Sequence, residues 1–175
     1  MSQADRLLRV ALLITSTVLL TTCTLQVSSG GPLRAGGDPS EVCSVQPDQG
    51  SAVFGNVVTN DGDTTLTITG AVLVEGESLE IRDAYVMPVD ETHSFVIGTG
   101  STDPTEPEAM AAWDSARKLD DDKLRAGQQV NIVLVIDNGA ADVGTTRAVR
   151  FTYEQGPEQF TADTNMMLEL TDNQC

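Results

Sequence analysis

The chain has 175 residues, of which 40% are hydrophobic and only 4% aromatic, and its formal net charge is −16. This length allows one domain and an additional segment. The acidic balance argues against nucleic acid as a partner, because like charges repel a phosphate backbone. It indicates a well-solvated surface and leaves open the binding of cations.

The N-terminal segment has the pattern of a secretory signal. Arg6 and Arg9 precede an apolar run from Val10 to Leu20 that contains no charged residue. A positively charged start followed by a run of about 7–15 apolar residues is typical of the export signal of a secreted protein. We therefore expect residues 1–22 to be a signal peptide or a membrane anchor. Arginines before the run place the rest of the chain outside the cytoplasm.

The next feature is Cys23, which ends the sequence "LTTC". This sequence resembles the lipobox of bacterial lipoproteins, in which signal peptidase cuts before a cysteine that then carries a diacylglyceryl group. Leu20 and Thr21 fit the pattern, whereas Thr22 departs from it because Gly, Ala or Ser is usual there. The resemblance implies lipidation of Cys23. An uncleaved transmembrane helix over Val10–Ser29, which has the roughly 20 residues needed, stays open, as does a freely secreted form.

Residues 23–42 predict a flexible tether. The segment is rich in Ser, Gly and Pro, which break both the helical and the strand period. Such a composition buries little apolar surface and does not order itself. We expect a spacer that holds the following domain, residues 43–175, clear of the membrane.

Two further cysteines lie at the two ends of this domain. With Cys23 set aside, Cys43 and Cys175 form an even pair in a compartment that we expect to be oxidising. The sequence therefore predicts a disulfide between them. The alternative is two free thiols.

From about Ser51 the sequence consists of short β-type runs separated by Gly, Asp, Asn and Pro. The clearest run places Val130, Ile132 and Leu134 inward and Asn131 outward. Seven closely spaced runs predict an all-β, immunoglobulin-like antiparallel β-sandwich. The runs cover residues 51–59, 64–76, 79–89, 93–99, 128–137, 145–155 and 165–171.

One stretch has a helical pattern instead. Thr105 is followed three residues later by Glu108, which is the spacing of a capping box. Apolar residues then recur at helical spacing. We predict one short helix in a crossover between the two sheets, with Trp113, the only tryptophan, as a core residue.

Two segments carry a family resemblance. "VVTNDGDTTLTITGAVL" resembles the start of bacterial immunoglobulin-like domains of the ASPM–SPD-2–Hydin type, where a strand ends at Asn and a Gly-Asp turn leads into an "LTIT" strand. "LRAGQQVNIVLVI" is similar to a later strand of those domains, with Gly127 at the turn. The whole arrangement also resembles uncharacterised lipoproteins of high-GC Gram-positive bacteria. The likeness implies a scaffold and no chemistry. The matching residues in the first segment are Asn60, Gly62, Asp63, Leu66, Ile68 and Thr69.

The sequence predicts no catalytic residues, no cofactor and no metal site. His93 is the only histidine, and its neighbour Ser94 would face the opposite way on a strand. Zinc needs three or four Cys or His ligands, which the chain does not supply. Acidic loops at Asp61 and Asp63 and at residues 120–122 lack the spacing of a calcium-binding EF-hand.

These features together predict a non-enzymatic interaction or structural module of the cell envelope. We expect it to be held outside the membrane and to present loops or an edge strand to another envelope protein. The alternative is a lipoprotein that binds calcium or a small ligand through its acidic loops.

Overall fold

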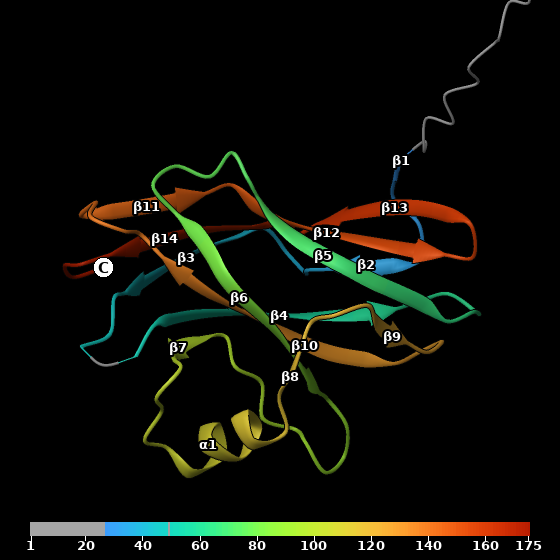
Figure 1. Ribbon diagram of the computed structural model, residues 1–175, viewed down its shortest axis with the longest axis horizontal. Helices are drawn as coiled ribbons and strands as arrows, with labels where there is room; N and C mark the ends of the chain where they lie inside the picture. The colour runs from blue at the N-terminus through green and yellow to red at the C-terminus, as the bar shows by residue number, and fades with distance from the viewer. Residues whose placement is uncertain (1–26, 49) are drawn as a thin grey trace, which may run out of the picture.

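In the computed structural model the described residues are 27–48 and 50–175, and they form a β-sandwich with one short helix (Figure 1). The predicted all-β class is confirmed. The expectations for residues 1–26, including the apolar run and lipidation at Cys23, lie outside the described residues. The strands are β1 (Val27–Ser29), β2 (Leu33–Ala35), β3 (Ser40–Val45), β4 (Ala52–Asn60), β5 (Leu66–Val74), β6 (Glu80–Pro88), β7 (Thr99–Ser101), β8 (Arg117–Lys118), β9 (Asp122–Leu124), β10 (Gln129–Asp137), β11 (Val143–Thr146), β12 (Ala148–Gln155), β13 (Glu158–Asp163) and β14 (Met166–Thr171), and the helix is α1 (Pro107–Asp114).

Two sheets pack face to face. One has the strand order β2-β4-β10-β6-β8, with β7 also on β4, and the other has the order β1-β13-β12-β5-β9. Their long strands follow the arrangement A-B-E-D against G-F-C of constant-type immunoglobulin domains. The sandwich is therefore immunoglobulin-like in topology. A third, short sheet, β11-β14-β3, continues the β12–β13 hairpin beyond a break in each strand.

The main core lies between the two large sheets. Alternate residues of β10 point into it, as predicted, and Ile132, Leu134 and Ile136 are at most 1% exposed. The opposite face of β10 is also buried, because Val133 and Val135 belong to a second apolar cluster. The outward position predicted for Asn131 is wrong. Its side chain is fully buried, and its Nδ2 donates a hydrogen bond to the Ile97 carbonyl oxygen at 2.9 Å.

Residues 89–116, between β6 and β8, form this second layer, and we call them the cap. The cap contains β7 and α1, and it lies on one side of the β4-β10-β6 sheet (Figure 1). The predicted helix is present as α1, but no side chain caps its N-terminus. It does not lie in a crossover between the sheets, because β6 and β10 are neighbours in one sheet.

The prediction of a strand over residues 93–99 is wrong except at Thr99, where β7 begins. The preceding residues cross over β4 at Gly55 instead of pairing along their whole length. A Cβ atom at Gly55 would lie 1.9 Å from the Ile97 carbonyl oxygen, so only glycine allows this approach. The Gly55 backbone N–H donates to the Gly98 carbonyl oxygen at 2.7 Å and holds the crossing chain in place.

The described part of the predicted tether is also ordered into strands. β1 runs parallel to β13, β2 pairs antiparallel with β4, and β3 runs parallel to β14. Leu33 and Ala35 of β2 are 4% and 8% exposed and belong to the core. The sandwich therefore begins before residue 43, and the transmembrane alternative does not extend to Ser29. No helix among residues 27–48 and 50–175 is long and apolar enough to cross a membrane.

Tyr153 holds this N-terminal segment against β12. Its hydroxyl donates to the Gly30 carbonyl oxygen at 2.8 Å and accepts from the Leu33 backbone N–H at 3.4 Å. Gly31 has φ +107°, and a Cβ there would lie 2.3 Å from the Tyr153 hydroxyl. The glycines that indicated flexibility in the sequence thus permit a close, specific contact.

Asn60 joins the two segments that carry the family resemblance. Its Nδ2 donates to the carbonyl oxygens of Thr64 at 2.8 Å and Leu124 at 3.0 Å, and its Oδ1 accepts from the Gly62 backbone N–H at 3.0 Å. Its backbone carbonyl accepts from the Gly127 N–H at 2.8 Å. The side chain is fully buried. Its amide fixes the turn after β4 and the end of β9, and the backbone carbonyl of the same residue fixes the turn before β10.

Candidate functional site

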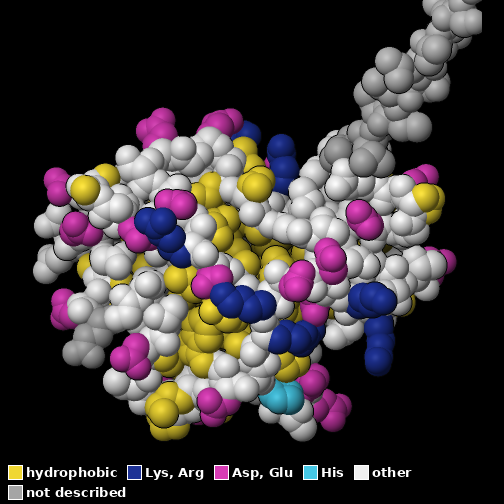
Figure 2. Space-filling view, viewed as in Figure 1, with side chains coloured by type: hydrophobic (Ala, Val, Ile, Leu, Met, Phe, Trp, Pro, Cys, Tyr) yellow, Lys and Arg dark blue, Asp and Glu magenta, His cyan; other side chains and the backbone are white. Residues whose placement is uncertain are grey.

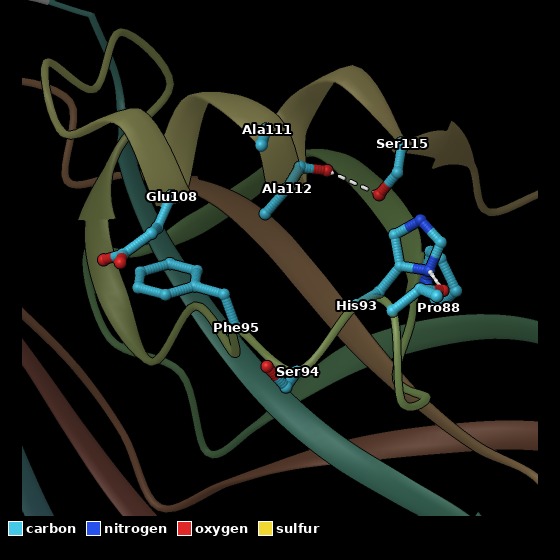
Figure 3. Close-up of a pocket in the computed structure, with 9 residues that line it drawn as sticks. Pro88, His93, Ser94, Phe95, Glu108, Ala111, Ala112 and Ser115 are labelled. Carbon is cyan, nitrogen blue, oxygen red and sulfur yellow. Dashed lines mark hydrogen bonds between the residues drawn. The ribbon is translucent and has the colours of Figure 1, made fainter.

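The most developed surface feature is a groove on the cap, between residues 92–106 and α1. It consists of two hollows of about 190 Å³ and about 450 Å³. Phe95 and Glu108 line both hollows, so the hollows are adjacent and form one elongated depression that we call the cap groove. Figure 3 shows the smaller hollow, with Phe95 and Glu108 at one end, His93 and Ser115 at the other, and α1 along one side.

Buried contacts hold both walls of the cap groove. On the helix side, Ala112 is 9% exposed and Trp113 packs edge-on against Tyr85 of β6, with ring centroids 5.3 Å apart. The helix ends at Ser115, whose hydroxyl donates to the Ala112 carbonyl oxygen at 2.8 Å. The opposite wall is fixed through Ile97 by the buried amide of Asn131. The shape of the groove therefore follows from the packing of the cap on the sheet.

Apolar side chains stand exposed around the groove. Phe95 and Val96, which line the groove, are 40% and 39% exposed, and Met110 of α1, which lines neither hollow, is 51% exposed. They are three of the seven large apolar side chains exposed among the described residues, and the other four are distributed over β3, β5, β11 and β14. Exposed apolar side chains gathered at a depression are typical of a binding surface.

The segment that forms the groove has several acidic residues and no Lys or Arg to balance their charge. Between Val89 and Ala116 the chain has no Lys or Arg, while Figure 2 shows acidic and apolar side chains together at the edge where α1 lies. The carboxylates of Asp103, Glu106 and Glu108 form no ion pair within the part of the chain that the structure describes. Elsewhere six cationic side chains pair with carboxylates. These six are Arg34, Arg82, Arg117, Lys118, Arg147 and Arg150.

His93 lies at the rim of the smaller hollow, in a loop. Its Nδ1 is 2.9 Å from Oδ1 of Asp90 and 3.0 Å from Oγ1 of Thr92. Ser94 lines the same hollow, but no hydrogen bond joins it to His93 among residues 27–48 and 50–175. The arrangement orients the histidine within its own loop and gives Ser94 no base.

The pKa of the Asp90 carboxyl is held well below its usual range. The main cause is the hydrogen bond from the Thr92 hydroxyl, at 2.6 Å, followed by the contact with His93. Backbone N–H groups of Thr92 and His93 also donate to the same oxygen, at 2.8 Å and 2.9 Å. Each of these bonds favours the ionised carboxylate.

We expect this loop to lose its order only in strong acid. Because the folded pKa of Asp90 is lower than the unfolded value of about 3.9, its contribution is complete above that value and is lost as the pH falls through the folded pKa. The Thr92 and His93 amide resonances, followed from pH 7 to pH 2, should therefore shift at a pH below that of an ordinary aspartate. Asp90→Asn should abolish this transition and Glu91→Gln should keep it. A midpoint near 3.9 would contradict the role given to Asp90.

The acidic loops considered for calcium are not brought together. Asp61 pairs with Arg34 at 2.8 Å, and Asp122 pairs with Arg117 at 2.7 Å. Across residues 27–48 and 50–175 no group of three or more His, Cys, Asp or Glu side chains is placed to hold a metal ion. Among the described residues, the structure therefore identifies none of the acidic loops as the calcium site that the alternative requires.

The two remaining cysteines meet at the far end of the sandwich. Cys43 of β3 and Cys175 form a disulfide, with their Cα atoms 5.7 Å apart. The bond joins an edge strand to the C-terminal residue of the chain. Cys23 lies outside the described residues.

The residues of the cap groove were not predicted as a site. The sequence pattern places Phe95 in a strand, Trp113 in the core and Glu108 in a capping box. Trp113 does pack against Tyr85, but it also lines the larger hollow. The one signal in the sequence was the absence of Lys and Arg from residues 89–116.

Comparisons with known proteins give no family. No family model matches the chain, and no curated protein matches it. Among solved structures, the Vibrio cholerae VesB protease is similar with a TM-score of 0.40 at 9% identity, covering 80% of this chain. The PapD-like domain 7 of human CEP192, described as an ASH or PapD-like domain, is similar with a TM-score of 0.35 at 13% identity, covering 82% of this chain and 87% of that one.

The chain spans 32% of the VesB protease chain. At these TM-scores and identities the two likenesses assign neither a family nor an activity. Membership of the ASPM–SPD-2–Hydin family stays a prediction from the sequence, beside the immunoglobulin-like strand order found here.

Proposed function

We propose that the protein is a non-enzymatic binding module of the cell envelope. Its N-terminal segment would hold it on the outer side of the membrane, through lipidated Cys23 or through an uncleaved helix that ends before β1. The sandwich would serve as the scaffold, and the cap groove would be the surface offered to another envelope protein.

The observation that carries this proposal is the cap groove. The seven immunoglobulin-type strands of the sandwich do not include residues 89–116, and this insertion is where exposed apolar side chains and unpaired carboxylates gather. The groove consists of two adjacent hollows that share Phe95 and Glu108, and a segment of a protein can occupy both. The extracytoplasmic location is supported by the signal-like pattern of residues 1–22 and by the Cys43–Cys175 pairing, since disulfides persist in oxidising compartments.

The function can be tested in the cells that make the protein. A photo-crosslinking amino acid placed at position 95 should join the full chain to one membrane-associated protein. The matched control is position 72, because Val72 is exposed to 52% but lies on β5, away from the cap. Equal crosslinking from both positions, or none from position 95, would contradict the proposal.

The anchoring can be tested on the same preparation. The intact mass of the protein extracted from membranes should reveal either a diacylglyceryl group on Cys23 or the uncleaved N-terminus, together with the loss of two hydrogens at the disulfide. Recovery of the full chain from the cytosol with its thiols free would rule out this part of the proposal.

A further inference from the structure

We propose that the cap groove binds a basic segment of its partner protein, with one arginine or lysine of that segment between the Phe95 ring and the Glu108 carboxylate. This inference rests on the proposed function and names the chemistry of the partner. It follows from the geometry of the two hollows, from the local charge and from an equivalent contact elsewhere in the molecule.

The geometry places an aromatic ring and a carboxylate at the centre of the groove. Phe95 and Glu108 are shared by the two hollows, and Figure 3 shows both side chains extending to the same end of the smaller hollow. Both side chains are exposed, and neither is engaged in an ion pair or ring contact with another described residue. A cation bound here would meet an aromatic ring and a negative charge together.

The molecule already contains this arrangement with its own residues. The Lys118 ammonium lies 4.8 Å from the centroid of the Tyr85 ring and pairs with the Asp83 carboxylate. There the cation comes from β8 and the ring and carboxylate come from β6. At Phe95 and Glu108 the ring and the carboxylate are present, but the chain provides no cation from residue 89 to residue 116.

The charge around the groove selects a basic ligand. Six acidic residues and no basic ones lie between residues 89 and 116. Such a field attracts positively charged segments and repels acidic ones, and its effect weakens as the salt concentration rises. The six are Asp90, Glu91, Asp103, Glu106, Glu108 and Asp114.

The apolar rim explains why a peptide segment fits better than a free cation. Val96 is exposed and lines the larger hollow, which Trp113 also lines. Long basic side chains bury their methylene stems against such surfaces and keep the charge at the edge. Apolar neighbours of the basic residue would cover the remaining exposed side chains. The preferred ligand is therefore a short segment in which basic and apolar residues alternate.

The test uses the only tryptophan of the chain as the reporter, since Trp113 lines the groove. The full chain in a non-ionic detergent is titrated with the peptide acetyl-Ala-Leu-Arg-Leu-Arg-Ala-amide while the Trp113 fluorescence is recorded. The matched peptide carries citrulline in place of arginine, which keeps the shape and removes the charge. We expect the arginine peptide to bind about tenfold more tightly, and raising the salt to weaken it.

Substitutions then locate the contact. Phe95→Leu keeps an apolar side chain and removes the ring, and Glu108→Gln removes the charge. Each substitution should weaken the binding of the arginine peptide by about threefold or more, the range expected for an exposed cation–ring contact. The control Glu154→Gln changes an exposed carboxylate of β12 and should leave binding unchanged. Unchanged melting temperatures show that the variants are folded.

Three results would overturn the inference: no binding of the arginine peptide, equal binding of the citrulline peptide, or undiminished binding by both variants. The failure of the proposed function is separate from these results. If position 95 still crosslinks to an envelope protein while the peptide test fails, the groove binds a partner of another chemistry. If position 95 does not crosslink, the groove is not the partner surface.

Discussion

Replacing Cys43 and Cys175 with serine should lower the free energy of unfolding by about 5 kcal/mol, the chain-entropy value for a closed loop of this size. The two residues are 132 positions apart, so the disulfide constrains nearly the whole described chain in its unfolded state. Domains of this size are stable by about 5–15 kcal/mol. The loss would therefore remove between about a third of this stability and all of it.

Urea denaturation of the full chain measures this effect. The control is Cys23→Ser, which leaves the Cys43–Cys175 bond intact and should not change the midpoint. Reduction with dithiothreitol should reproduce the double substitution. A loss below about 1 kcal/mol would show that the unfolded chain gains little freedom when the bond is cut.

Replacing Asn60 with alanine should cost about 3 kcal/mol, at roughly 1 kcal/mol for each of three hydrogen bonds. The substitution leaves the Thr64 and Leu124 carbonyl groups and the Gly62 N–H without their partner. Asn60→Asp should be at least as harmful. A carboxylate cannot donate to the two carbonyl groups, and its charge would be buried.

Thermal and urea denaturation of the two Asn60 variants provide the measurement. The matched control is Asn165→Ala, which removes one exposed hydrogen bond from Nδ2 to the Gly37 carbonyl oxygen and should cost well under 1 kcal/mol. Hydrogen exchange of the Leu124 region should accelerate only in the Asn60 variants. If Asn60→Ala proves as mild as Asn165→Ala, the buried amide does not tie the turn after β4 to the end of β9.

The periodicity of the sequence predicted the sandwich core but not the second layer on it. In β10 the alternation of Ile132, Leu134 and Ile136 is a local pattern, and the structure confirms its inward face. Whether Asn131 is buried depends on the loop around Ile97, which comes from another part of the chain. A pattern of period two cannot show that a cap covers the outer face.

The tether prediction failed for a different physical reason. It relied on the small amount of apolar side chain in residues 23–42, but β1, β2 and β3 are held largely by backbone pairing with β13, β4 and β14. Backbone pairing is independent of side-chain type. The hydroxyl of Tyr153, more than a hundred residues later in the sequence, provides the other attachment.

The family motif identified Asn60 and Gly127 without showing what they do in the fold. No pattern in the sequence identified the cap groove as a site. Asn60 and Gly127 were matched to a family pattern, and the structure shows the hydrogen bond that links them. Phe95 and Glu108 belong to different elements, and only the packing of α1 brings them to one depression. The spacing of Phe95 and Glu108 in the sequence does not show that they line one depression.

The pairing of β1 with β13 also determines how the molecule would resist a mechanical pull. The two strands run parallel, so a force along the N-terminal end would shear their hydrogen bonds together instead of opening them one after another. When the molecule is pulled between its N-terminus and its C-terminus, unravelling beyond β1 and β2 would stop at Cys43, because the disulfide passes the force directly to Cys175. The molecule would thus extend by a short, bounded length, and the residues between the two cysteines would bear no load.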